Sequence, residues 1–196
     1  FRNFYKQEMN FIRGYATGLA SRRLNSPNSD GIGNELRTNL HKKQLGPWRI
    51  NTFMQAETIP KETNFVALDE ELKDPYGIPQ LRVSVDYDDN DEKMTVDFLD
   101  EMSEMFDVAG FTNIKADDDH RSPGLDIHEM GGVRMGKDSK TSLLNKWNQL
   151  HHCKNVFVTD GACMTSTSTQ NPSLTYMALT ARAANFAINE LKKKNL

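Results

Sequence analysis

The chain has 196 residues and a formal net charge of −3, with 37% hydrophobic and 26% charged residues. This length is enough for one sizeable domain or for two small ones that share a core. No apolar run approaches the ~18 residues that a membrane span needs, and lysines and arginines form no sustained stripe. A membrane-spanning protein and a nucleic-acid-binding protein are therefore both disfavoured. We expect a soluble protein of the cytoplasm or the periplasm, and the composition does not select between these compartments.

The first 47 residues mix aromatic residues with Gly, Ser, Asn and Arg, and they show little periodicity. They predict a loop-rich lead-in (1–47), with a loop at 25–35 and only weak periodicity between Glu35 and Gln44. The chain starts at Phe1, without a methionine, in a stretch typical of a protein interior. We expect it to be part of a longer polypeptide with a missing upstream region, or a chain whose leader has been removed.

Residues 48–126 are predicted to form a sheet and a helix. Three strand-like stretches with partial apolar–polar alternation are separated by prolines and a glycine, namely 48–59, 64–69 and 80–87. They predict an antiparallel sheet with one solvated or ligand-facing side.

A polar turn at 88–93 then precedes a predicted helix over 94–109. Methionines and phenylalanines recur there at three- and four-residue steps as a core stripe, and Gly110 is well placed to end the helix. A short strand-like piece at 111–116 and an acidic loop follow.

The last third (127–196) begins with a glycine-rich turn at 128–136. A buried strand is predicted at 155–162, ending in Asp-Gly, and a helix of about five turns closes the chain. Asn171 is predicted to cap this helix and Pro172 to occupy its first position. The elements together predict an α+β fold, in which an antiparallel sheet has flanking helices and a strand–helix segment follows.

The strand, the Asp160-Gly161 pair, the polar loop and the helix are what a nucleotide-type cofactor site requires. Asp160, at the C-terminal end of a strand, can accept hydrogen bonds from ribityl or ribose hydroxyls. The helix that follows points its positive N-terminus at any anionic group there. By themselves, His128 is a turn histidine and Asn171 is a helix cap, and both have sufficient structural explanations.

Two cysteines, Cys153 and Cys163, lie ten residues apart without CxxC spacing, and we interpret them as reduced, packed residues. His151, His152 and Cys153 are consecutive, so their side chains diverge. We expect no metal site in this chain.

Three ordered motifs carry a resemblance: HEMGGVRMG, then NVFVTDGACM, then STQNPSLTYMALTARAANFAI. Together they resemble the C-terminal signature of the glucose–methanol–choline (GMC) family of FAD-dependent oxidoreductases. The stretch AETIPKETNFVALDEELKDPYGIPQLRVSVDY also resembles the substrate-domain sheet of that family, so the resemblance covers about residues 48–191.

The resemblance implies roles for individual residues. His128 would take the hydroxyl proton of the substrate while a hydride passes to flavin N5, and Asn171 would hold the substrate oxygen. Asp160 and Gly161 would lie along the ribityl and pyrophosphate groups of FAD. The backbone at Pro172, Ser173 and Leu174 would face the pyrimidine side of the flavin. A catalytic pair of two histidines is excluded, because Asn171 occupies the second position.

The amino-terminal half of the family, with its GxGxxG motif for the adenosine moiety, has no counterpart in this chain. We expect the N-terminal part of the same parent polypeptide to supply it, and this chain alone to bind FAD poorly. The predicted activity is oxidation of a CH–OH group of a sugar, polyol or other alcohol. The alternative is a non-catalytic carbohydrate- or small-molecule-binding module derived from the same fold. The substrate, the electron acceptor and the oligomeric state are not indicated.

Overall fold

The computed structural model describes residues 9–25, 27–42, 45–119, 122–124 and 127–196. The start of the predicted lead-in (1–8), one residue of the predicted 25–35 loop (26) and parts of the loop before His128 (120–121 and 125–126) lie outside the described residues. The chain divides into two compact units. One, which we call the ribbon unit, is Ala16–Gln55, and the other comprises Phe1–Tyr15 and Ala56–Leu196. Strands and helices are both present, which confirms the predicted α+β class.

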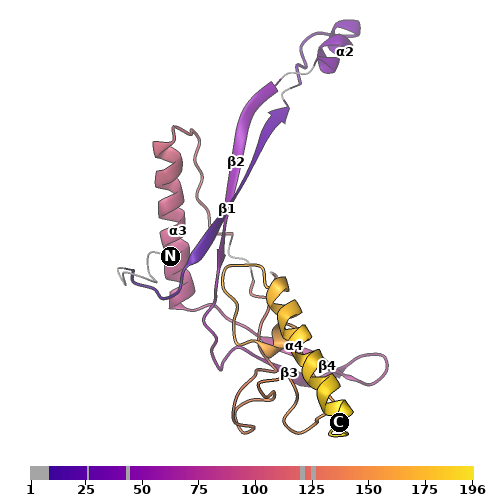
Figure 1. Ribbon diagram of the computed structural model, residues 1–196. Helices are drawn as coiled ribbons and strands as arrows, with labels where there is room; N and C mark the ends of the chain where they lie inside the picture. Colours follow the sequence, from indigo (N-terminus) through magenta and orange to yellow (C-terminus); the bar gives the residue numbers. More distant parts are fainter. Residues whose placement is uncertain (1–8, 26, 43–44, 120–121, 125–126) are drawn as a thin grey trace. The chain divides into compact units, whose positions relative to one another are not determined.

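The ribbon unit holds most of β1 (Tyr15–Asn25) and β2 (Leu45–Ala56), which form a two-stranded sheet, and α2 (Asn34–His41) lies between them in sequence. Figure 1 shows the two strands side by side. Thr52 Oγ1 donates to Gly18 O, and Arg23 Nε donates to Gly46 O. Residue numbers therefore fall along β2 as they rise along β1, so the pair is antiparallel.

This strand and helix replace the irregular lead-in predicted for 1–47. The glycine and serine residues of β1 favoured a loop in the sequence, but Gly18 has a packing role. A Cβ at Gly18 would come within 2.1 Å of the Phe53 ring on the neighbouring strand. The aromatic ring thus covers the glycine, an arrangement compatible with a strand.

A second two-stranded sheet pairs β3 (Phe65–Lys73) with β4 (Pro79–Ser84) in antiparallel register. Leu68 lies opposite Leu81, and a register shift follows Leu68. The predicted strands at 64–69 and 80–87 correspond to this hairpin, and the one at 48–59 overlaps β2. The described strands form two separate sheets where the sequence predicted one.

Helix α3 (Asp89–Val108) confirms the predicted helix but begins five residues earlier than expected. The predicted polar turn at 88–93 is wrong because Asp88 and Asp91 form a capping box, which turns an acidic stretch into a helix start. At the other end, Phe111 N donates to Phe106 O, and Gly110 has a φ of 80°. This Schellman arrangement ends the helix at the predicted glycine.

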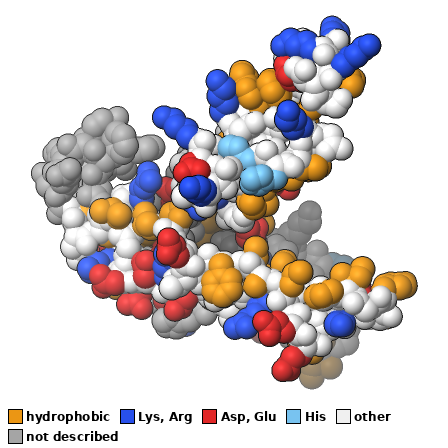
Figure 2. Space-filling view, turned by 90° about the horizontal axis from the view of Figure 1, so that it is seen from below, with side chains coloured by type: hydrophobic (Ala, Val, Ile, Leu, Met, Phe, Trp, Pro, Cys, Tyr) orange, Lys and Arg blue, Asp and Glu red, His pale blue; other side chains and the backbone are white. Residues whose placement is uncertain are grey.

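The first half of α3 supplies part of a small core. Met94 and Phe98 are buried, and the Tyr15 ring meets the Phe98 ring edge-on at 5.7 Å. The second half of the predicted core stripe is wrong, because Met105 is 39% exposed and Ala109 is also exposed. Many other large apolar side chains are exposed as well, and Figure 2 shows hydrophobic side chains at the surface of one face.

Two further predicted strands are wrong. Residues 111–116 are exposed and irregular, and 155–162 contains only one isolated bridge, between Phe157 and Gln149. A strand needs a ladder partner along its length, and among the described residues 155–162 has this single pairing. The final helix α4 (Ser173–Lys192) is as long as predicted. No described helix is long and apolar enough to cross a membrane.

Candidate active site

The glycine-rich turn lies alongside the Asp160-Gly161 segment. Three backbone hydrogen bonds join them: Gly131 N to Gly161 O at 3.1 Å, Val133 N to Ala162 O at 3.0 Å, and Met135 N to Cys163 O at 3.1 Å. Two motifs that are about 30 residues apart in sequence are therefore held together through the backbone. Positive φ angles at Gly131 and Gly132, 94° and 91°, allow the turn to reach this position.

Gly161 is buried at the point where the turn and helix α4 meet. A Cβ at this position would lie 2.5 Å from Glu129 O, 2.9 Å from Tyr176 Oη and 3.2 Å from Met130 Sδ. Tyr176, in the first turn of α4, also donates to Met130 Sδ at 3.5 Å. The three predicted motifs therefore converge on Gly161, and only glycine fits there without displacement of its neighbours.

Asp160 has a local structural role that the sequence did not predict. Its Oδ1 accepts a hydrogen bond from Ala162 N at 3.0 Å and so caps a short 3₁₀ helix, Gly161–Cys163. The side chain is exposed. Burial, with the nearby Asp160 carboxylate as the next cause, raises the pKa of Tyr176 above its ordinary value. The Tyr176 hydroxyl therefore remains a hydrogen-bond donor at neutral pH.

His128 has an unusual backbone conformation. Its φ is 71°, in the left-handed region, and its side chain is half-buried. Non-glycine residues adopt this conformation at a cost of about 1 kcal/mol or more, although histidine tolerates it better than most. Such conformations gather at functional sites, so the geometry at His128 motivates a functional hypothesis.

Asn171 does not cap helix α4 as predicted. The N-cap is Pro172, which has φ −88° and ψ 0°, and α4 has no side-chain cap hydrogen bond. The first helical bond runs from Tyr176 N to Pro172 O. Pro172 is itself in the right-handed helical region, so the helix start moves past Asn171. Asn171 is exposed, and its side chain is not used to start the helix.

The start of α4 presents backbone donors. Ser173 and Leu174 are exposed, Leu174 at 78%, and no acidic residue occupies the first turn. The first N–H groups of a helix have no partner within it, and the helix dipole adds a partial positive charge there. This end of α4 therefore suits a group that accepts hydrogen bonds.

Asn148 has a role that sequence reasoning missed. This residue is fully buried with a φ of 62°, and its Nδ2 donates to Val158 O at 3.0 Å. Its Oδ1 accepts from Arg182 of α4 at 2.9 Å. Asn148 thus ties the segment before Asp160 to helix α4. The only sequence signal is that asparagine tolerates the left-handed conformation.

The two cysteines differ. Cys163 is buried at 1% exposure, and burial raises the pKa of its thiol, whereas Cys153 is exposed. The packed role predicted for both is therefore wrong for Cys153.

A hollow of about 390 Å³ is lined by Met135, Gly136, Lys137, Asn145, Lys146 and His151. Its lining contains neither His128 nor Asn171.

Comparison with known proteins identifies the family to which the chain belongs. The family model described as GMC oxidoreductase matches residues 60–180. The chain belongs to the GMC oxidoreductase family, and the match is to the C-terminal part of that family, which confirms the resemblance seen in the sequence.

The chain is similar to individual oxidoreductases. It is 35% identical over 137 residues to 2-methyl-1,2-propanediol dehydrogenase of Mycolicibacterium austroafricanum, covering 70% of this chain and 25% of that protein. It is 30% identical over 144 residues to the fructose dehydrogenase large subunit of Gluconobacter japonicus, covering 74% and 26%. It is 25% identical over 120 residues to pyranose 2-oxidase of Tricholoma matsutake, covering 61% and 21%. The chain thus spans about a quarter of the length of these relatives.

Proposed function

We propose that the whole protein is an FAD-dependent oxidoreductase that oxidises a CH–OH group of a sugar, polyol or other alcohol. Membership of the GMC oxidoreductase family supports this, as do relatives named for the oxidation of a diol and of sugars. The observation that carries the proposal is the convergence on Gly161 of the His128 turn, the Asp160 segment and the start of α4.

The residues present fit part of an FAD site. The start of α4 offers the backbone of the buried Pro172 and of the exposed Ser173 and Leu174 without a competing acidic side chain, which suits the pyrimidine side of a flavin. Asp160 keeps one carboxylate oxygen beyond its bond to Ala162, and this oxygen can accept from a ribityl hydroxyl. Gly161 brings the backbone close without a side chain. In this proposal the N-terminal part of the parent polypeptide holds the adenosine half.

His128 and Asn171 are the proposed catalytic pair. When bound, FAD would supply the hydride acceptor for the oxidation of the substrate carbon. An imidazole nitrogen of His128 would take the hydroxyl proton as a general base. The Asn171 amide, which does not cap α4, would donate to the substrate oxygen and stabilise its developing negative charge.

The test is His128→Ala in the full-length protein, with His152→Ala as the matched control because His152 is an exposed histidine in the same unit. We expect His128→Ala to keep the flavin absorbance and to slow flavin reduction by substrate at least about 100-fold, the lower range for a general base. His152→Ala should leave the rate unchanged.

Loss of FAD from His128→Ala would instead assign His128 a structural role. A full-length protein that purifies without colour and takes up no added FAD would contradict the oxidoreductase proposal itself. It would favour the alternative, a binding module of the same fold.

A further inference from the structure

The ribbon unit has secondary structure but almost no core. None of its described residues is buried. Six large apolar side chains in it are at least 50% exposed, namely Leu19, Ile32, Leu40, Leu45, Trp48 and Phe53. An isolated two-stranded hairpin is marginally stable in water, and exposed apolar side chains gain free energy when another surface covers them. The exposed side chains therefore indicate a surface that a protein partner or another part of the parent polypeptide covers.

The charge of the ribbon unit is opposite to that of the rest of the chain. It contains six Lys or Arg residues and two carboxylates, a net charge of +4, while the whole chain has −3. The remainder accordingly carries −7. Arg22, Arg37 and Arg49 form no ion pair with any described residue. The ribbon unit thus combines exposed apolar side chains with a net positive charge, which fits an acidic partner.

Helix α3 is strongly acidic. Eight of its 20 residues are carboxylates and one is a lysine. Asp100 and Glu104 lie one helical turn apart and repel each other, and the last turn has no basic residue to offset the negative end of the helix dipole. A cationic partner against this helix would relieve both effects.

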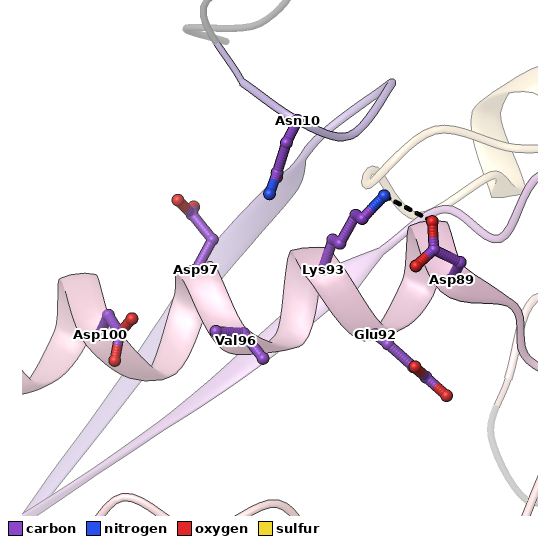
Figure 3. Close-up of a pocket in the computed structure, with 7 residues that line it drawn as sticks. All are labelled: Asn10, Asp89, Glu92, Lys93, Val96, Asp97 and Asp100. Carbon is purple, nitrogen blue, oxygen red and sulfur yellow. Dashed lines mark hydrogen bonds and ion pairs between the residues drawn. The ribbon is translucent and has the colours of Figure 1, made fainter.

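The exposed face of α3 is hollowed and partly apolar. A groove of about 370 Å³ is lined by Asn10, Asp89, Glu92, Lys93, Val96, Asp97 and Asp100. In Figure 3 Lys93 reaches back to Asp89, while Glu92 and Asp100 are joined to none of the side chains drawn. Val96 is 59% exposed within this face, and Val108 is 81% exposed at the end of the helix. The face therefore matches the ribbon unit in both charge and apolar character.

We propose that the ribbon unit of one copy docks on the acidic face of α3 in a second copy, and that the reciprocal contact closes a two-fold dimer. A protein occupant is favoured over an anionic membrane, because the exposed apolar residues are spread along both strands, as at Leu19, Trp48 and Phe53, as well as around α2. A reciprocal contact uses the same two surfaces in each copy, so it is closed and leaves no open end.

The experiment measures the mass of the full-length protein by analytical ultracentrifugation at low salt and in ~1 M salt, where charges are screened beyond ~3 Å. We expect a dimer that dissociates at high salt. Arg22→Glu/Arg49→Glu should weaken dimerisation by at least ~10-fold, and so should Asp100→Arg/Glu104→Arg. Combining the two pairs of substitutions should restore the dimer.

Lys115→Glu/Lys140→Glu is the matched control, because it changes the net charge equally at two exposed lysines outside the ribbon unit. It should leave the dimer intact, and far-ultraviolet circular dichroism would check that every variant is folded. A monomer at all concentrations in low salt would overturn the proposal. So would a dimer that the ribbon and α3 substitutions leave unchanged, since another surface would then hold it. Binding of wild-type monomer to vesicles rich in anionic lipid would also overturn it, in favour of a membrane surface.

Discussion

Gly161 is buried, and its surroundings leave no room for a side chain. The sequence placed it next to Asp160 as a cofactor neighbour, whereas the structure adds a packing constraint from Glu129, Met130 and Tyr176. Two of these neighbours come from the His128 turn, and the third comes from α4. A single methyl group added at Gly161 would therefore disturb its contact with the His128 turn and its contact with α4.

We predict that Gly161→Ala destabilises the protein by about 1–3 kcal/mol, the usual cost of forcing a methyl group into packed surroundings. The obstructing Glu129 oxygen belongs to the backbone, so it cannot move aside as a flexible side chain would. Thermal and urea unfolding would measure the change. Gly14→Ala is the control, because a Cβ at Gly14 has no atom within 4 Å. Equal stability of the two variants would show that the turn containing Glu129 shifts to accommodate the added methyl group.

For single residues, the sequence predicted which motifs matter better than it predicted the structural role of each residue. His128, Asp160 and Gly161 could be selected because the family motifs are contiguous in sequence. Asn148 could not, because its importance comes from burial and from two partners, Val158 and Arg182, at separations of 10 and 34 residues. A lone asparagine between Trp147 and Gln149 carries no local signal of such contacts.

The two long helices begin in different ways, and the sequence predicted the wrong one to be capped. Asp88 caps α3 through the N–H groups of Asn90 and Asp91, whereas Asn171 was expected to cap α4 and does not. Both residues are good caps by type. The outcome depends on the next residue, since a proline in the right-handed region displaces the N-cap by one position at α4.

We predict that Asp88→Ala destabilises the protein by about 1 kcal/mol at pH 7 and that Asn171→Ala changes its stability by less than about 0.5 kcal/mol. Denaturant unfolding of the two variants, compared with wild type, measures the difference. If Asn171→Ala is as stable as wild type, a loss of activity in that variant reports on chemistry and not on folding. An equal cost for both substitutions would show that Asn171 supports the helix after all.

The Asp88 contribution should depend on pH. Burial opposes the charged form, but the N–H groups of Asp91 and Asn90, together with Lys61, outweigh it and lower the pKa of Asp88 in the folded state. A carboxylate with a lowered folded pKa stabilises the protein above its unfolded pKa of ~3.9, and it loses this effect as the pH falls through the folded value. The cost of Asp88→Ala should therefore shrink between pH 5 and pH 2, and a constant cost over that range would contradict the assignment.

Local patterns also account for which elements were predicted. The hairpin of β3 and β4, the body of α3 and the length of α4 follow from alternation, helical spacing and terminal glycine, all of which are short-range. The strand expected at 155–162 failed because β structure depends on distant partners. Strand β1 was missed for the related reason that Gly18 is covered by Phe53 from another strand.

For the molecule as a whole, the two units should differ in stability. The second unit contains the buried residues Met94, Phe98, Leu144 and Cys163, and the ribbon unit has no buried residue among those described. Regions with few buried apolar contacts open at low free energy. The sequence could not show this, since Leu19, Trp48 and Phe53 have the apolar character of core residues.

We predict that amides of β1 and β2 exchange hydrogen for deuterium much faster than those of α3 near Met94 and Phe98 when the protein is monomeric in high salt. Mass spectrometry after timed exchange would measure this, and the α3 amides serve as the internal reference. Docking on a second copy should slow exchange in the ribbon unit at low salt. Slow exchange of β1 and β2 in the monomer would contradict the view that this unit lacks a core of its own.

The different surroundings of the two cysteines have a consequence for oxidative stress. Cys153 faces solvent, whereas the Cys163 thiol is buried with a raised pKa at the junction that holds the His128 turn. Peroxide reacts with the thiolate form of cysteine. We therefore expect Cys153 to be oxidised before Cys163. The exposed sulfur can thus be oxidised to a sulfenic acid while the junction beside Gly161 keeps its reduced thiol.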